Sequence, residues 1–272
     1  MKTYTFYGNS TSTADIAFLT AITFAKKGYK TLFIELGEGN AQITYQLGIE
    51  EQRVKTTDYY ILGHQKNHPI QNCILTIDSI KEFLLDKEKD LRKEIEELPK
   101  NLSILLKKTQ PEEKSLNEEE WQQVITRMIK EGQEEHDIMI LSTKGRTLSY
   151  SVFFPLLLSD EAVLILEDKP EDLRIFNSFI IDLQKIRETF HPRAILLSHS
   201  INIEKEHYKK TKINIMHTFS LKALQKIKLS TWNGYNVHIE EIDQVYNCLT
   251  NEKDSPKRHK FSWFNKKKEK RR

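Results

Sequence analysis

The sequence predicts an α/β protein with a doubly wound, mostly parallel sheet, flanked by helices on both faces. Three observations predict this fold class. Six short, β-rich apolar runs occur along the chain, and helix-like stretches separate them, as βαβ units require. The length of 272 residues suits one large domain with a tail. We expect that domain over residues 1–250 and a flexible basic tail over residues 251–272.

The predicted strands are continuous apolar runs rather than alternating patterns, which is typical of strands buried on both faces of a sheet. In chain order they cover residues 3–7, 31–36, 102–106, 137–142, 162–167 and 194–199. Residues 73–77, 213–217 and 235–240 are weaker strand candidates.

Four helices are expected between these strands, over residues 14–27, 79–98, 117–132 and 171–190. The first ends in two lysines followed by Gly28, and both features favour a helix C-terminus. The third begins with Asn117 and three glutamates, which suit the positive end of a helix dipole.

Composition sets limits on location. Charged residues make up 30% of the chain and no run of about 18 apolar residues occurs, so no membrane-spanning helix is expected. The first residues lack the apolar core of a signal peptide. Two distant cysteines, Cys73 and Cys248, are expected to be buried thiols, without a disulfide or a metal site. These features predict a cytoplasmic protein.

The segment "AFLTAITFAKKGYKTLFIELGEGNAQITYQLG" (residues 17–48) and the later "EEHDIMILSTKG" (residues 134–145) resemble the ParA/MinD group of deviant-Walker P-loop ATPases. The first corresponds to the P-loop helix and second strand of that family, and the other to the Walker B strand. The resemblance spans roughly residues 2–245, and the order and spacing of the motifs carry it. It implies a P-loop NTPase-like fold.

The stretch "YGNSTSTADIAF" (residues 7–18) lies where this family has its phosphate-binding loop. One alignment register places Thr13 at the family's lysine, Ala14 at its Mg²⁺-binding hydroxyl and Gly8 at its signature lysine. The other register places Ala14 and Asp15 at the lysine and the hydroxyl. Both registers lack the two lysines that the family uses to bind phosphate.

Asp15 weakens the case for phosphate binding further. A carboxylate in the first turn stabilises a helix by about 0.3–1 kcal/mol. Ser12 and Asp15 have a spacing close to that of a capping box, so we expect the helix start to be satisfied by its own side chains. Two like charges 4 Å apart repel by roughly 4 kcal/mol at an effective dielectric of about 20, which disfavours a phosphate here.

The resemblance points to three further positions. It matches Glu35 to the acidic residue that helps to activate water, places Gly37 where a second acid is expected, and places Ser142 at the Mg²⁺-supporting Walker B aspartate. We therefore predict a pseudo-ATPase that has no catalytic residues and needs no cofactor. An active ATPase that uses ATP and Mg²⁺ through unusual ligands, or an unrelated doubly wound fold, remains an alternative.

The tail is the other informative stretch. Residues 256–272 contain nine Lys/Arg and one Glu, about +8, whereas the rest of the chain sums to about −5. Aromatic residues among basic ones suit an anionic membrane surface, whereas nucleic-acid binding and a solvated or partner-binding tail remain alternatives. The expected contact residues are Lys257, Arg258, Lys260, Phe261, Trp263, Phe264, Lys266, Lys267, Lys268, Lys270, Arg271 and Arg272.

Together these features predict a scaffold or localisation factor for a membrane-associated assembly of the pilus, secretion, conjugation or division type. Degenerate members similar to TadZ/CpaE-type localisation proteins are the model for this expectation. The expected partners are proteins of such a machine, the inner face of the membrane and a second copy of the chain. A DNA-binding partition-type module is the other alternative.

Overall fold

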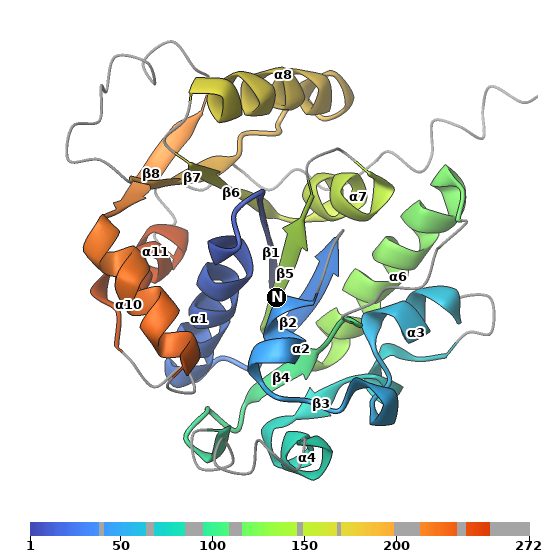
Figure 1. The fold of residues 1–272 in the computed structure, drawn as a ribbon. Coiled ribbons are helices and arrows are strands. Elements are labelled where there is room, and N and C mark those ends of the chain that lie inside the picture. The colour runs from blue at the N-terminus through green and yellow to red at the C-terminus, as the bar shows by residue number, and fades with distance from the viewer. Residues whose placement is uncertain are drawn as a thin grey trace, which may run out of the picture.

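The computed structural model describes residues 1–37, 41–63, 68–84, 95–108, 116–145, 149–167, 170–198, 213–232 and 238–250. Within these ranges eight strands form one sheet in the order β3-β4-β2-β5-β1-β6-β7-β8 (Figure 1). All neighbouring strands are parallel except β3, which runs antiparallel to β4 at one edge. The doubly wound, mostly parallel sheet predicted from the sequence is confirmed.

The strands lie close to their predicted positions. They are β1 Lys2–Gly8, β2 Thr31–Gly37, β3 Leu75–Thr76, β4 Leu102–Leu105, β5 Ile138–Lys144, β6 Glu161–Glu167, β7 Arg193–Leu197 and β8 Asn214–Phe219. The weak strand candidate over residues 235–240 is wrong in its described part, because Glu240 begins a helix there.

Helices cover both faces of the sheet. They are α1 Ser12–Lys26, α2 Gln42–Gln46, α3 Thr57–Leu62, α4 Ile77–Ile80, α6 Glu118–Glu135, α7 Tyr150–Leu158, α8 Pro170–Ile186, α10 Leu221–Trp232 and α11 Glu240–Thr250. Short 3₁₀ turns lie at Glu51–Arg53, Ile70–Asn72 and Lys81–Phe83. Figure 1 shows α1, α10 and α11 on one face and α3, α6, α7 and α8 on the other.

Three of the four predicted helices are confirmed with shifted ends, and one is wrong. The helix expected over residues 79–98 is not continuous, because α4 ends at Ile80 and Leu84 pairs with Ile49 in an isolated β-bridge, although Ile95 and Glu96 are helical. Residues 85–94 of that prediction lie outside the described ranges. The predicted cap at Asn117 is confirmed, since its side chain accepts from the backbone N–H of Glu120 in a capping box.

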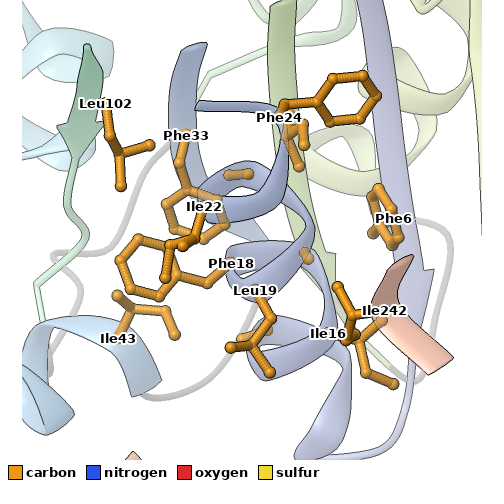
Figure 2. Close-up of a cluster of buried hydrophobic side chains, with 14 of the residues drawn as sticks. Phe6, Ile16, Phe18, Leu19, Ile22, Phe24, Phe33, Ile43, Leu102 and Ile242 are labelled. Atoms are coloured by element: carbon orange, nitrogen blue, oxygen red, sulfur yellow. The ribbon is translucent and has the colours of Figure 1, made fainter. Parts of the chain in front are cut away.

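Helix α1 is the centre of the larger core cluster. Thirteen of its 15 residues are buried, because the sheet covers one side of α1 and helices α10 and α11 cover the other. Figure 2 shows Phe18 and Ile22 pointing toward Phe33 of β2, while Ile16 meets Ile242 of α11. A helix buried on both sides needs apolar residues nearly all round, which explains why its sequence shows little amphipathic pattern.

A buried ionic network ties α11 to the edge where the parallel strands begin, which we call the amino edge. Arg193 at the start of β7 is 3% exposed, and its Nη2 lies 3.2 Å from Oε1 of Glu161 at the start of β6. Nη1 of Arg193 donates to the carbonyl oxygen of Cys248 in the last turn of α11. Lys2 Nζ lies 3.3 Å from the same Glu161 oxygen.

In the described ranges, no helix is both long enough and apolar enough to cross a bilayer. Cys73 is buried, as expected, and burial raises the pKa of its thiol to about 11. Cys248 is only half-buried, which corrects the expectation that both thiols are buried.

Candidate functional site

The carboxyl edge of the sheet, where the parallel strands end, gathers the predicted site residues. The register pairs Lys144 with Gly8 on one side and with Gly37 on the other. One pleat earlier, Ser142 of β5 is paired with Glu35 of β2. The chain continues from Gly8 through residues 9–11 into α1, so the predicted loop positions share this edge with the positions on β2 and β5.

The loop between β1 and α1 lies tightly against β6. A Cβ atom added to Gly8 would lie 2.6 Å from the carbonyl oxygen of Ile165 and 2.7 Å from Oγ1 of Thr13. Thr13 is fully buried, and its hydroxyl has no hydrogen-bond partner among the described residues. Ala14 is also buried, within the apolar core cluster around α1.

The predicted capping box of Ser12 and Asp15 is wrong. Helix α1 begins at Ser12, its N-cap is Thr11, and no side chain of the N-cap bonds the helix start. Ser10 satisfies the first turn instead, since its carbonyl oxygen accepts from Thr13 N–H at 3.1 Å and its hydroxyl from Ser12 N–H at 3.3 Å. The helix starts two residues earlier than predicted, which places Asp15 too far into α1 to form the box.

Asp15 binds a neighbouring helix rather than its own. Its Oδ1 accepts a hydrogen bond from Nε2 of Gln46 at 3.0 Å, and the residue is only 5% exposed. Burial raises the pKa of the Asp15 carboxyl to about 6, while hydrogen bonds from Gln46 and Gln42 and the charge of Lys144 oppose that rise. A phosphate at the start of α1 would therefore lie close to the buried Asp15 carboxylate.

Glu35 also has a structural partner. Its Oε1 accepts from the backbone N–H groups of Gln42 at 2.6 Å and Ile43 at 3.2 Å, so it caps the first turn of α2. Burial raises the pKa of Glu35, and these hydrogen bonds and the charge of Lys107 oppose the rise. The resemblance implied a role in activating water, and in this structure the one partnered oxygen of Glu35 holds a helix instead.

Lys107 is a site residue that the sequence analysis missed. It lies at the carboxyl end of β4, is 3% exposed, and donates from Nζ to the carbonyl oxygen of Gly37. Thr44 of α2 donates to the carbonyl oxygen of Lys107 at 2.7 Å. The available signal was a lysine directly after a buried strand, at the edge where ligands bind in open α/β sheets.

Two lysines offset the charges of the buried carboxylates at this site. Lys107 lies near the buried Glu35, and the charge of Lys144 acts on the buried Asp15. Residues 9–14 contain no lysine or arginine. Ser142, which replaces a Walker B carboxylate in the resemblance, is 2% exposed and brings no negative charge for a divalent ion. The lysines near this site therefore interact with the protein's own carboxylate and carbonyl groups.

Gly37 makes a direct test of this packing possible. Its φ of +88° lies in the left-handed region, and an added Cβ would lie 2.5 Å from the backbone nitrogen of Lys144. Gly28 has a φ of +96° with nothing within 4 Å of such a Cβ. We expect Gly28→Ala to cost about 1–2 kcal/mol and Gly37→Ala at least about 2 kcal/mol more, measured by urea unfolding. Equal costs would contradict the close approach of β2 and β5.

The predicted contact residues of the tail, Lys257 to Arg272, lie outside the described ranges. The last described element before them is α11, which ends at Thr250.

No protein-family model matches the chain, and no curated protein matches it. Solved structures do match. They include the MinC:MinD cell division protein complex from Aquifex aeolicus, with a TM-score of 0.63, 14% identity, and coverage of 93% of this chain and 96% of that chain. MinD from Pyrococcus horikoshii complexed with Mg-ADP has a TM-score of 0.64, 10% identity, and coverage of 92% and 96%.

A ParA family ATPase from Chlorobium tepidum has a TM-score of 0.61 at 12% identity, with coverage of 91% of this chain and 97% of that chain. At these identities the likeness shows the fold alone. The chain therefore has the fold of the MinD and ParA ATPases, as the sequence motifs predict, and it spans almost the whole length of these structures.

Proposed function

We propose that this chain is a non-catalytic protein with the ParA/MinD fold, which acts as a scaffold or localisation factor for a membrane-associated assembly. The observation that carries the proposal is the buried carboxyl group of Asp15 in the first turn of α1. In P-loop proteins that helix end supplies backbone N–H groups and positive potential to a phosphate. Here the same place holds a negative side chain bound to Gln46.

Three losses support the absence of catalysis. The loop has no lysine to neutralise the β- and γ-phosphates, as the P-loop lysine does. Glu35 is engaged in capping α2. Ser142 lacks the charge with which an aspartate helps to hold Mg²⁺.

The remaining function is binding. MinD occurs in a complex with MinC in one of the similar structures, so a protein partner is in keeping with this fold. A homodimer is proposed as a second mode of association. The basic tail with its three large aromatic side chains is proposed to bind the anionic inner surface of the membrane and to place the protein at that surface.

A titration of the full chain with Mg²⁺-ATP tests the loss of the nucleotide site. We expect a Kd weaker than about 1 mM by isothermal calorimetry, because charge complementarity for the triphosphate is missing. Micromolar binding would contradict the proposal. The Asp15→Asn variant is a useful companion, since it removes the repulsion while leaving the loop without a lysine, and it is expected to gain affinity without reaching the micromolar range.

One observation favours an active ATPase with unusual ligands as the second candidate. Lys144 lies between Gly8 and Gly37 at the carboxyl edge, and its charge reaches Asp15. If Lys144 supplies the missing cation, the wild-type chain binds Mg²⁺-ATP and Lys144→Gln abolishes that binding. If the first proposal is right, the two proteins give the same flat titration.

A DNA-binding partition-type module is a further candidate, because plasmid partition proteins from Borrelia burgdorferi share the fold. Removing residues 255–272 and measuring vesicle binding and DNA binding separately distinguishes it. Loss of vesicle binding with unchanged DNA binding supports the membrane function. Loss of DNA binding alone supports the partition module.

A further inference from the structure

Helix α2 is held against the domain by a buried acid at each of its ends. At its start, Glu35 of β2 accepts from the backbone N–H groups of Gln42 and Ile43. At its end, Gln46 donates from Nε2 to Asp15 of α1 at 3.0 Å. We call these two acids the carboxylate pair. A helix of only five residues is thus fixed by carboxylates from a strand and from another helix.

Apolar side chains favour the docked position of α2. Ala41, Ile43 and Leu47 are all less than 5% exposed. Figure 2 shows Ile43 in the core cluster that also contains Phe18 of α1. Burial of aliphatic side chains is favourable, so the docked helix is the major state.

The carboxylate pair opposes this docking. Asp15 and Glu35 are 5% and 4% exposed, and a carboxylate loses hydration when it is covered in this way. Oε2 of Glu35 is buried and has no hydrogen-bond partner among the described residues. Because α2 contacts both acids, its movement away from them would let water reach the pair.

Other charged groups at this edge offset the pair only in part. Lys144 of β5 and Lys107 after β4 act on the two carboxylates. Asp58 of α3 is buried and accepts from the backbone N–H of Lys108 at 3.0 Å. Tyr45 is the titratable side chain of α2 itself. Two lysines and one further acid therefore surround the pair.

Burial outweighs these partners. It raises the pKa of the Asp15 carboxyl from 3.8 to about 6, and it also raises the pKa of Glu35. The protonated acids therefore favour the docked helix, and the ionised acids favour hydration. For Asp15, the support that protonation gives to docking is complete below about pH 4 and is lost as the pH rises through about 6.

Glycines with positive φ lie on both sides of the segment. The φ angle of Gly37 is +88° and that of Gly48 is +61°. Glycine accepts large changes in φ and ψ, which a moving segment needs at its ends. Beyond Gly48 the chain is fixed again, because Ile49 pairs with Leu84 in the β-bridge. These features limit the segment that moves to residues 41–47.

We propose that residues 41–47, which we call the α2 latch, undock locally from β2 and α1, so that the carboxylate pair becomes hydrated and the carboxyl edge is uncovered. The docked latch is the major state, and the undocked latch is a minor state whose population rises when the pair carries its charges. This device goes beyond the proposed function and depends on neither a membrane nor a nucleotide. It gives the carboxyl edge two states that a partner can distinguish.

Hydrogen exchange in the full chain at pH 7.5 tests the latch. The reporting amides are those of Gln42, Ile43 and Leu47, which are hydrogen-bonded when α2 is docked. The reference amides are those of Met139 and Ile140 in the central strand β5. After correction for intrinsic rates, we expect the reporting amides to exchange at least about tenfold faster than the reference amides, because local opening breaks fewer contacts than global unfolding.

The test variant is Asp15→Asn, which removes one charge and keeps an oxygen that accepts from Gln46. We expect it to slow exchange at the reporting amides by about hundredfold at pH 7.5 and by about threefold at pH 4, the ratios that follow from a pKa of about 6 when docked and 3.8 when hydrated. The matched control is Asp182→Asn on the surface of α8, with an expected change of less than about twofold.

Far-UV circular dichroism verifies that the proteins are folded at both pH values. If the wild type unfolds at pH 4, pH 5 replaces it, with an expected effect of about fifteenfold for Asp15→Asn.

Two results would overturn the latch. Reporting amides that exchange as slowly as those of β5 would show that α2 opens only when the whole domain unfolds. Fast exchange that Asp15→Asn leaves unchanged at pH 7.5 would show that the carboxylate pair does not drive the opening. Both results are independent of the Mg²⁺-ATP titration and the vesicle binding that test the proposed function.

Discussion

Replacing Arg193 with methionine is expected to lower the free energy of unfolding by about 3 kcal/mol, because it leaves the buried Glu161 carboxylate with Lys2 as its remaining ion-pair partner. Arg193 and Glu161 are 3% and 4% exposed, and their side chains lie 3.2 Å apart. The change also removes the donor to the carbonyl oxygen of Cys248, which ties α11 to the sheet. Urea unfolding followed by circular dichroism at pH 7.5 measures the effect.

The matched double variant Arg193→Met/Glu161→Leu removes both charges. It is expected to recover at least half of the loss, because Lys2 can be hydrated once its partner is gone, its side chain being 25% exposed. A double variant that is less stable than the single one would contradict this account. It would show that the decrease in stability of Arg193→Met comes from lost packing rather than from the buried Glu161 carboxylate.

Replacing Asp15 with asparagine is expected to stabilise the protein at pH 7.5 by about 2–3 kcal/mol. Burial raises the pKa of Asp15 from the ordinary 3.8 to about 6, so ionisation is harder in the folded chain than in the unfolded one. The stability that protonated Asp15 provides is fully present below about pH 4 and is lost as the pH rises to about 6. The advantage of the asparagine variant therefore grows across that interval and is constant above it.

The measurement compares the two proteins by urea unfolding at pH 4 and pH 7.5. The control is Asp182→Asn, because Asp182 lies on the surface of α8 with a side chain 59% exposed. We expect its effect to stay within about 0.5 kcal/mol at both values. A pH-independent effect of Asp15→Asn would show that Asp15 is not protonated more readily in the folded protein, and the electrostatic argument against a phosphate at α1 would weaken.

If the proposed loss of catalysis holds, an acid that costs stability in the folded protein is the kind of feature that a binding function would preserve. Asp15 and Gln46 join α1 to α2, and the next residue before Gln46 is the exposed Tyr45. The position of this pair links the candidate site to a surface available for a partner.

Most of the fold could be predicted from the sequence, because strands buried on both faces leave a strong local signal. Each of the six main apolar runs became a strand within two residues of its predicted start. The helix over residues 79–98 is interrupted for a non-local reason, since Leu84 pairs with Ile49 in a β-bridge. Sequence periodicity contains no information about a bridge to a residue 35 positions away.

The location of the candidate site could be predicted from the sequence, but the interactions of its residues could not. The order of motifs located Gly8, Asp15, Glu35, Gly37 and Ser142 at one edge, because parallel strands all end on the same side. The roles of Asp15 and Glu35 could not be predicted, because each carboxylate is bound by a residue of α2, and the position of α2 against β2 and α1 is set by tertiary packing. Local capping rules predicted that Asp15 would cap its own helix, α1, whereas its carboxylate accepts from Gln46 of α2.

Hydrophobic periodicity and motif order were thus sufficient for the sheet, its direction and the missing lysines of the loop, since those follow from residue type and spacing along the chain. The partners of Asp15, Lys107 and Arg193 were decided by folding, which brings segments 30 to 160 residues apart within hydrogen-bond distance. A charged side chain is stable inside a protein only where a specific partner meets it. That partner is a property of the packed structure.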